Sequence, residues 1–274
     1  MKPLLLIHLL SLLILLFQPT SAIDFIFNGF NSSDLLFYGS ATIESRIVSL
    51  TNQTNFTVGR VLYRTKIQTK KPNSPDVYPF STSFIFSMAP YRNVLAGHGF
   101  VFLFVPFTDF KGATAAEHLG LFNRTTDGNP SSHVFGIEFD VFKNQEFNDI
   151  DNNHVGIDVN SLTSNSSHAA GYWPDDITID DEKLFKKLKL NNGENYQVWI
   201  DYKDSLINVS MALAENEDMD AYLLEKMNSY DLWSNYSQSF GYSSFTTHPT
   251  FEEIRQGNSS SMSLSWSNTT VQGR

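Results

Sequence analysis

The sequence predicts an all-β fold of the antiparallel β-sandwich class. Apolar residues recur with period two along many short runs, which are rich in aromatic and β-branched side chains and end at Gly, Pro, Asn or Ser. The 274 residues are 41% hydrophobic and 18% charged, which is enough apolar material for a complete core. Because no repeat or linker divides the runs, we expect one sandwich domain. The runs lie at 25–27, 61–63, 83–86, 100–104, 134–139, 196–200, 206–211 and 262–266.

Two segments fit the strand pattern less well. Residues 182–190 are basic and fit either a short helix or the end of a strand. Residues 215–233 join an acidic stretch to Leu223, Leu224 and Met227 at helix-compatible spacing. For both segments the plainer expectation is solvated surface.

Composition excludes several classes of function. The chain has no cysteine, which excludes a disulfide framework, a zinc–thiolate site and a thiol nucleophile. Its formal charge of -10 argues against nucleic acid or an anionic membrane as a partner, because phosphate binding needs clustered Lys and Arg. Because the chain has no cysteine, any metal must be held by oxygen and imidazole ligands.

The N-terminus predicts export. Residues 1–22 join a positive start at Lys2 to an apolar run and a small-residue cleavage site, the pattern of a secretory signal peptide, which leaves 23–274 as the mature domain. An uncleaved membrane anchor is the alternative, but the run is shorter than the ~20 residues that a spanning helix needs. Nine N-x-S/T triplets agree with a secreted glycoprotein that keeps no membrane anchor after cleavage. These triplets begin at Asn31, Asn52, Asn55, Asn123, Asn165, Asn208, Asn235, Asn258 and Asn268.

The densest set of metal-competent side chains lies in residues 138–154. Glu138 and Asp140 are two apart in a predicted strand, so their carboxylates project from the same face. Asn144, Asp149 and His154 follow along a loop rich in Asn and Asp. Crowded carboxylates repel one another unless cations neutralise them, and oxygen donors with one imidazole suit a Ca²⁺ site beside a Mn²⁺ site. An acidic surface loop without a metal is the alternative reading.

The sequence also resembles the legume-type (L-type) lectin family over essentially the whole mature chain. The most specific match is Glu-Phe-Asp at 138–140 followed by His-Val-Gly-Ile-Asp-Val-Asn at 154–160. Segments at 24–30, 58–63, 119–123, 240–243 and 264–267 match further family motifs in the correct order. The resemblance implies the family's jelly-roll sandwich, with two structural metals that hold a binding loop.

The resemblance also implies a ligand set for each metal. The matching Mn²⁺ ligands are Glu138, Asp140, Asp149 and His154, and the matching Ca²⁺ ligands are Asp140, the Phe142 carbonyl, Asn144 and Asp149. Asp151 is a rival for Asp149, which is preferred on spacing. Both metals would be structural and would take no part in catalysis.

The sugar site implied by the resemblance is altered in this chain. Asn144 and Phe142 match the residues that donate to a sugar hydroxyl and stack on the sugar ring, but His98 stands where the family has an aspartate. Neutral imidazole accepts one hydrogen bond, whereas a carboxylate accepts several. Glu117 stands at a family glycine and narrows the approach to its N–H. A Gly-His-Gly segment here is similar to the lectin ectodomains of plant receptor kinases, which implies weak or altered monosaccharide specificity.

Three functions compete. The first is a secreted, apoplastic, non-catalytic lectin-like protein of plant type that binds glycans or cell-wall carbohydrate, with a homodimer allowed. The second is a lectin-fold protein with a degenerate sugar site that binds an apolar small ligand or a protein partner. The third is a glycoside hydrolase, because Glu138 and Asp140 have a spacing used by such enzymes. Retaining hydrolysis needs a further carboxyl ~5 Å away, and Phe142 and Lys143 occupy the next stretch, so we do not expect catalysis.

Overall fold

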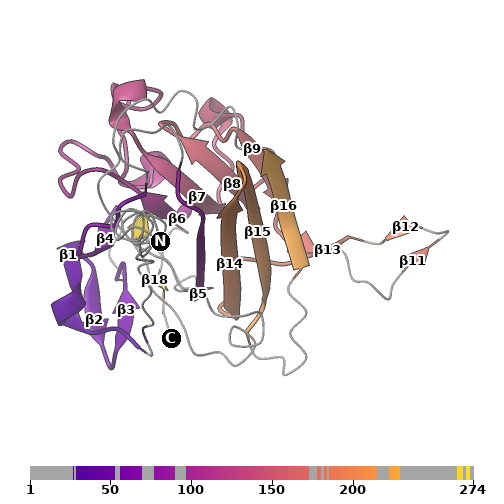
Figure 1. Ribbon diagram of the computed structural model, residues 1–274, viewed down its shortest axis with the longest axis horizontal. Helices are drawn as coiled ribbons and strands as arrows, with labels where there is room; N and C mark the ends of the chain where they lie inside the picture. Colours follow the sequence, from indigo (N-terminus) through magenta and orange to yellow (C-terminus); the bar gives the residue numbers. More distant parts are fainter. Residues whose placement is uncertain are drawn as a thin grey trace, which may run out of the picture.

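The protein is a sandwich of two antiparallel sheets in a computed structural model (Figure 1). The structure describes residues 27, 29–52, 56–69, 77–89, 97–172, 178–179, 182–183, 185–214, 222–228, 264–267 and 270–271. The predicted signal peptide, residues 1–22, lies outside this set. Among the described residues, the helices are short 3-10 turns, and none has the length and apolarity to cross a membrane.

The larger sheet has seven strands in the order β1-β4-β17-β6-β7-β8-β9. Their bounds are β1 (Leu35–Gly39), β4 (Val58–Tyr63), β17 (Leu264–Ser267), β6 (Gly99–Phe104), β7 (Phe135–Asp140), β8 (His154–Val159) and β9 (Ser166–Ala169). The smaller sheet has five strands in the order β16-β15-β14-β5-β18. Its bounds are β16 (Tyr222–Asn228), β15 (Leu206–Leu213), β14 (Asn195–Lys203), β5 (Phe80–Ala89) and β18 (Thr270–Val271).

Shorter elements connect the strands. Three two-stranded sheets pair β2 (Thr42–Glu44) with β3 (Ile47–Ser49), β10 (Gly171–Tyr172) with β13 (Lys186–Lys187), and β11 (Thr178–Ile179) with β12 (Glu182–Lys183). The 3-10 turns are η1 (Ser32–Asp34), η2 (Ala116–His118), η3 (Pro130–Ser132) and η4 (Gln145–Phe147). The turns η2 and η4 belong to the loops that form the candidate site.

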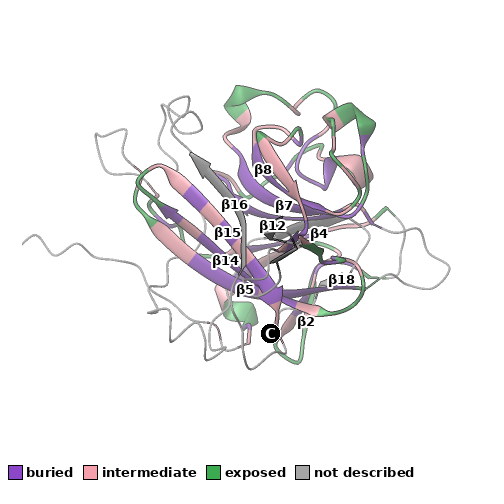
Figure 2. Cartoon of the chain, turned by 90° about the vertical axis from the view of Figure 1, so that its right-hand side faces the viewer, coloured by how far each residue is buried: buried purple, intermediate pink, exposed green. Residues whose placement is uncertain are grey.

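The core between the sheets is built from aromatic side chains. On β6, Phe100, Phe102 and Phe104 point inward with period two. Phe100 and Phe102 meet Phe84 of β5, and Phe100 also meets Phe86. Phe104 meets Phe80, which is also on β5. Figure 2 shows buried stretches along β5, β14 and β15 and along β7 and β8, where the sheets face each other. This arrangement confirms the predicted all-β antiparallel sandwich.

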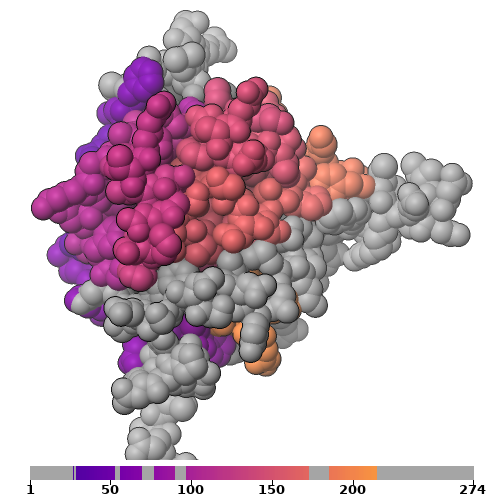
Figure 3. All heavy atoms as spheres, turned by 90° about the horizontal axis from the view of Figure 1, so that it is seen from above, coloured from indigo at the N-terminus to yellow at the C-terminus, as the bar shows by residue number. Residues whose placement is uncertain are grey.

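The seven-stranded sheet is buried on its other face as well. Val101 and Leu103 of β6 point away from the sandwich core and pack with Phe110, Leu119 and residues near them in the 105–122 loop. Every residue of β6 is therefore buried, and the strand reads as a continuous apolar run. The loops over this face are part of a second core. Figure 3 shows the middle of the chain, magenta to salmon, gathered on one face of the molecule.

The two segments that fit poorly turn out to contain strands. Within 182–190 the structure has β12 and β13, and no helix among its described residues. Residues 222–228, which contain Leu223, Leu224 and Met227, form β16. This strand pairs with β15, with a register shift between Val209 and Ser210. Residues 215–221 and 229–233 lie outside the described part of the chain.

Candidate functional site

The site begins with acidic side chains on the loop-covered face of β7 and β8. Asp140 lies opposite His154 in the antiparallel register, and Glu138 lies opposite Gly156. One ligand atom from each of Glu138, Asp140 and His154 lies within 4.8 Å of the others, and all three residues are buried. Period two along β7 therefore brings the two carboxylates together, and β8 adds the imidazole.

Hydrogen bonds orient the His154 ring. Its Nδ1 lies 3.1 Å from the Asp151 carbonyl oxygen, and its Nε2 lies 3.3 Å from Glu138 Oε1. Burial lowers the pKa of His154, but the hydrogen bond and charge of Glu138, with the charge of Asp149, outweigh it and the pKa is raised. With Nδ1 donating to a carbonyl, Nε2 faces the carboxylates, which is the orientation that a metal ligand needs.

The buried acids resist ionisation in the absence of a cation. Burial raises the pKa of Asp140 well above its usual range, and the charge of Glu138 raises it further. The same two causes raise the pKa of Asp158, whose Oδ2 is buried without a hydrogen-bond partner. A divalent cation would supply the missing positive charge, so this donor set fits a metal.

Three residues that were not predicted from the sequence complete the site: Gly156, Asp158 and Ser164. The Ser164 hydroxyl lies within reach of Glu138 Oε1 and is 2.9 Å from Asp158 Oδ1. Gly156 leaves the room that the Glu138 carboxylate fills, because a Cβ there would collide with that carboxylate and with Ser164 Oγ. Period two from His154 could have identified Gly156 and Asp158, whereas no local signal pointed to Ser164.

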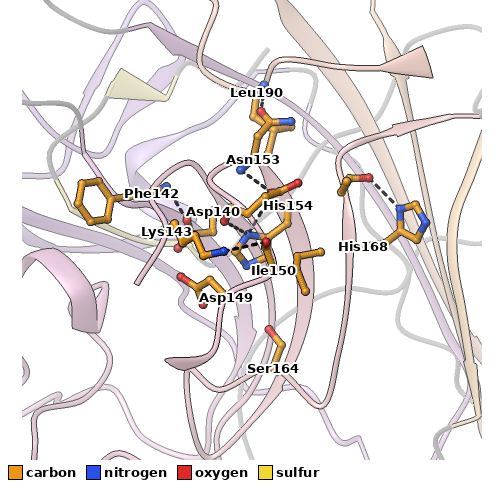
Figure 4. A network of polar contacts seen from close by, with 12 residues as sticks. Asp140, Phe142, Lys143, Asp149, Ile150, Asn153, His154, Ser164, His168 and Leu190 are labelled. Atoms are coloured by element: carbon orange, nitrogen blue, oxygen red, sulfur yellow. Dashed lines mark hydrogen bonds and ion pairs between the residues drawn. The ribbon is translucent and has the colours of Figure 1, made fainter. Parts of the chain in front are cut away.

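The loop after β7 folds around its own carboxylates (Figure 4). The Phe142 N–H donates to Asp140 Oδ1 at 2.6 Å, and the Asn144 N–H donates to Asp149 Oδ2 at 2.5 Å. Burial raises the pKa of Asp149 to about 6. Asp149 stands outside the tight Glu138–Asp140–His154 group, although its charge acts on His154.

Asp151 takes a different position from Asp149. Its Oδ1 lies 3.8 Å from His154 Nδ1, on the ring edge that faces away from Glu138, and accepts from the Asn153 N–H at 2.8 Å. Asp151 therefore lies on the Nδ1 side of the imidazole, where it can orient the ring but does not meet Glu138.

His98, Phe142 and Asn144 meet at the edge of this loop. The rings of His98 and Phe142 lie 4.3 Å apart, and His98 Nδ1 lies 2.9 Å from Asn144 Oδ1. Phe142 is 45% exposed, while Asn144 is buried. Burial lowers the pKa of His98, so we assign a neutral ring whose Nδ1–H donates to Asn144. This leaves Nε2 as the single acceptor that His98 offers a ligand.

Glu117 lies on the neighbouring loop, in a strained turn. Ala116 and Leu119 have φ of 62° and 49°, a region that costs non-glycine residues about 1–3 kcal/mol each. The Glu117 carboxylate lies 3.4 Å from Nδ1 of the buried His118, and its charge reaches His98. The structure thus brings Glu117 to the rim of the group formed by His98, Phe142 and Asn144.

The predicted glycosylation sites fall into three sets. Asn31, Asn52 and Asn165 are exposed. Asn123 and Asn208 are half-buried, and Asn123 Nδ2 donates to the Gly112 carbonyl at 3.0 Å. Asn55, Asn235, Asn258 and Asn268 lie outside the described residues.

Two proteins of Arabidopsis thaliana are similar to this chain in amino-acid sequence. L-type lectin-domain containing receptor kinase VII.1 of Arabidopsis thaliana is 61% identical over 211 residues, covering 76% of this chain and 30% of that protein. A lectin-like protein of the same organism is 40% identical over 221 residues, covering 75% of this chain and 79% of that protein. This chain thus spans about a third of the length of the receptor kinase, and the aligned part does not include that protein's kinase region.

Solved structures share its fold. Lectin II from Ulex europaeus superposes with a TM-score of 0.66 at 21% identity, covering 93% of this chain and 96% of that one. Winged bean acidic lectin in complex with methyl-α-D-galactose superposes with a TM-score of 0.65 at 24% identity, covering 91% and 94%. The model of the legume lectin domain matches residues 22–269. The chain therefore belongs to the legume lectin domain family.

Proposed function

We propose that the chain is a secreted, apoplastic and non-catalytic carbohydrate-binding protein with altered monosaccharide specificity. The observation that carries the proposal is the meeting of His98, Phe142 and Asn144 beside the buried acids. A half-exposed aromatic ring beside amide and imidazole groups can stack on a sugar and bond its hydroxyls. The predicted signal peptide and the exposed sequons support secretion.

The same proposal assigns the metal ligands. Glu138, Asp140, Asp149 and His154 would hold Mn²⁺, and Asp140, the Phe142 carbonyl, Asn144 and Asp149 would hold Ca²⁺. When bound, the cations neutralise the carboxylates and fix the loop that carries Phe142 and Asn144. Asn144 Oδ1 has two lone pairs, so it can accept from His98 and still ligate calcium. Carboxylates held by metal are not free for proton transfer, which supports a non-catalytic site.

A glycan array tests the function. We expect binding to at least one class of glycan with Ca²⁺ and Mn²⁺ present, loss of the signal in EDTA, and recovery when both ions are returned. The physical reason is that the cations hold the loop of Phe142 and Asn144 in place. An array with no metal-dependent signal on any glycan contradicts the lectin assignment.

Substitution of His98 tests the site itself. His98→Asp supplies two acceptor oxygens where the imidazole offers one, so we expect monosaccharide affinity to rise. One charge-assisted hydrogen bond contributes about 1.5–3 kcal/mol, which corresponds to about tenfold or more in Kd. Isothermal calorimetry with a panel of monosaccharides measures the change.

The matched control is His168→Asp, because His168 lies on β9, apart from the acid cluster in Figure 4. We expect it to leave the affinity unchanged. Equal affinities for His98→Asp and the unchanged protein would show that His98 does not limit the site.

A second candidate function has its own support. His98, Phe142 and Asn144 already contact one another, and Phe142 and Ile150 are 45% and 47% exposed. Exposed apolar side chains beside polar groups that already bond one another suit an apolar small ligand or a protein partner. A glycan array without signal, together with binding of such a ligand that Phe142→Ser abolishes, would favour this function.

A further inference from the structure

Arg60 lies beneath the loop that carries Glu117. From β4, its Nε and Nη2 donate to the carbonyl oxygen of Gly120 at 2.9 and 2.5 Å. Its guanidinium carbon lies 4.2 Å from the centroid of the Phe110 ring. Burial lowers the pKa of Arg60 to about 10, so the side chain remains charged at neutral pH. One side chain therefore holds both ends of the 110–120 segment.

The turn that Arg60 holds is strained. Backbone hydrogen bonds close it from the Leu119 N–H to the Ala116 carbonyl and from the Gly120 N–H to the Thr114 carbonyl, at 2.9 and 2.8 Å. Ala116 and Leu119 nevertheless keep positive φ, which such residues adopt only when their surroundings enforce it. The double hydrogen bond from Arg60 to Gly120 is one such constraint.

The turn contacts the proposed metal-binding loop. His118 is 4% exposed, and its ring meets the Phe147 ring edge-on, with centroids 5.7 Å apart. Phe147 ends η4, between the proposed metal ligands Asn144 and Asp149. Movement of the turn would withdraw the surface on which this part of the loop packs.

We propose that Arg60 is a positioning residue: by fixing the turn at 116–120, it places His118 against Phe147 and so preorganises the metal-binding loop. A loop held in its binding conformation loses less entropy when it binds a ligand. The inference rests on the proposed metal site, and its test separates the two.

The chain offers a matched control in Arg64. Its Nε and Nη2 also donate to backbone carbonyls, those of Ser33 and Leu35, at 2.8 and 2.9 Å. These bonds hold the segment at the start of β1 and contact neither of the two site loops. Arg64→Lys therefore removes a comparable set of hydrogen bonds without touching the proposed path.

The experiment measures terbium luminescence and hydrogen exchange of the full chain. Tb³⁺ is the probe because it occupies oxygen-rich calcium sites. For Arg60→Lys we expect faster exchange of the amides at 114–122 and 144–149 and a terbium Kd raised about tenfold, which corresponds to about 1.4 kcal/mol. Arg64→Lys should leave both within about twofold.

A second variant tests the contact between the turn and the metal-binding loop. Phe147→Leu removes the ring that His118 contacts but leaves the hydrogen bonds of Arg60 intact. We expect it to raise exchange at 144–149 and the terbium Kd, while the amides at 114–122 stay protected. This pattern would show that the coupling runs from the turn to the loop through that contact.

Three results would overturn the inference. One is an unchanged terbium Kd in Arg60→Lys, with a loss of melting temperature equal to that in Arg64→Lys, which is what a purely structural arginine gives. Another is faster exchange at 114–122 alone. The last is a normal terbium Kd in Phe147→Leu. Should the unchanged protein not bind terbium, the proposed metal site fails, and exchange at 144–149 in Arg60→Lys still decides whether the two loops are coupled.

Discussion

Chelation with EDTA is expected to lower the melting temperature, and the loss is expected to grow as the pH rises from about 4 to about 8. Cations at about a thousand times their Kd stabilise a folded protein by about 4 kcal/mol. For a domain of this size, each kcal/mol shifts the melting temperature by about 2–4 °C, so the full effect is about 8–16 °C.

The pH dependence follows from the acids around His154. Burial raises the pKa values of Asp140, Asp149 and Asp158, so the folded, metal-free protein holds protons that the unfolded chain has released. Its stability therefore falls as the pH rises from the ordinary value of 3.8 towards each raised pKa, which for Asp149 is about 6. The raised pKa of His154 acts in the same direction above pH 6.5, because its stabilising proton is lost there.

Bound cations reverse this trend because they replace the protons on the same groups. Thermal unfolding followed by fluorescence, with EDTA and with Ca²⁺ and Mn²⁺ across this pH range, measures the difference. Asp140→Asn should lose most of the response, whereas Asp204→Asn, at an exposed turn between β14 and β15 of the other sheet, should keep it. A response to EDTA that is absent or independent of pH would contradict the assigned site.

Gly156→Ala is expected to disable the metal site through a single methyl group. Gly156 has ordinary strand geometry, since it is not among the residues with positive φ, so alanine fits its backbone. The added Cβ would collide with the Glu138 carboxylate and the Ser164 hydroxyl. Overpacking of this kind costs about 1–3 kcal/mol, and displacing the groups around a metal lowers affinity by about 10- to 100-fold.

The control for this change is Gly128→Ala. Gly128 has φ of 76° but no atom within 4 Å of an added Cβ, so alanine brings backbone strain without collision. Manganese affinity measured by calorimetry should fall in Gly156→Ala and stay unchanged in Gly128→Ala. Equal affinity in Gly156→Ala and the unchanged protein would mean that Glu138 is not a ligand.

The strands could be predicted from the sequence wherever a local pattern settled the structure. The runs at 100–104 and 134–139 were correctly predicted as strands and correspond to β6 and β7. Aromatic residues with period two all point to one face of a strand, whereas in a helix they would point in different directions. Residues 222–228 were harder, because Leu223, Leu224 and Met227 suit either a helix or a strand. Pairing with β15 decides between them, and that contact is remote in sequence.

In the candidate site, too, local patterns could be predicted from the sequence and contacts between remote segments could not. Glu138, Asp140 and His154 were predictable because strand period and a short loop bring them together. Arg60 and Ser164 were not, because they reach their partners across the sheet or from the next loop. The hydrogen bond between His98 and Asn144 also needed the fold, since the two residues are 46 positions apart.

The second core beneath the 105–122 loop restricts how such a protein can evolve. Phe110 and Leu119 are buried against the seven-stranded sheet, so most changes at these positions would unfold the loop before they altered what it binds. Glu117, at the half-exposed rim of the same loop, is released from that constraint. New ligand preferences in this lineage should therefore arise by substitution of a few rim residues. The backbone conformation of the loop should stay the same.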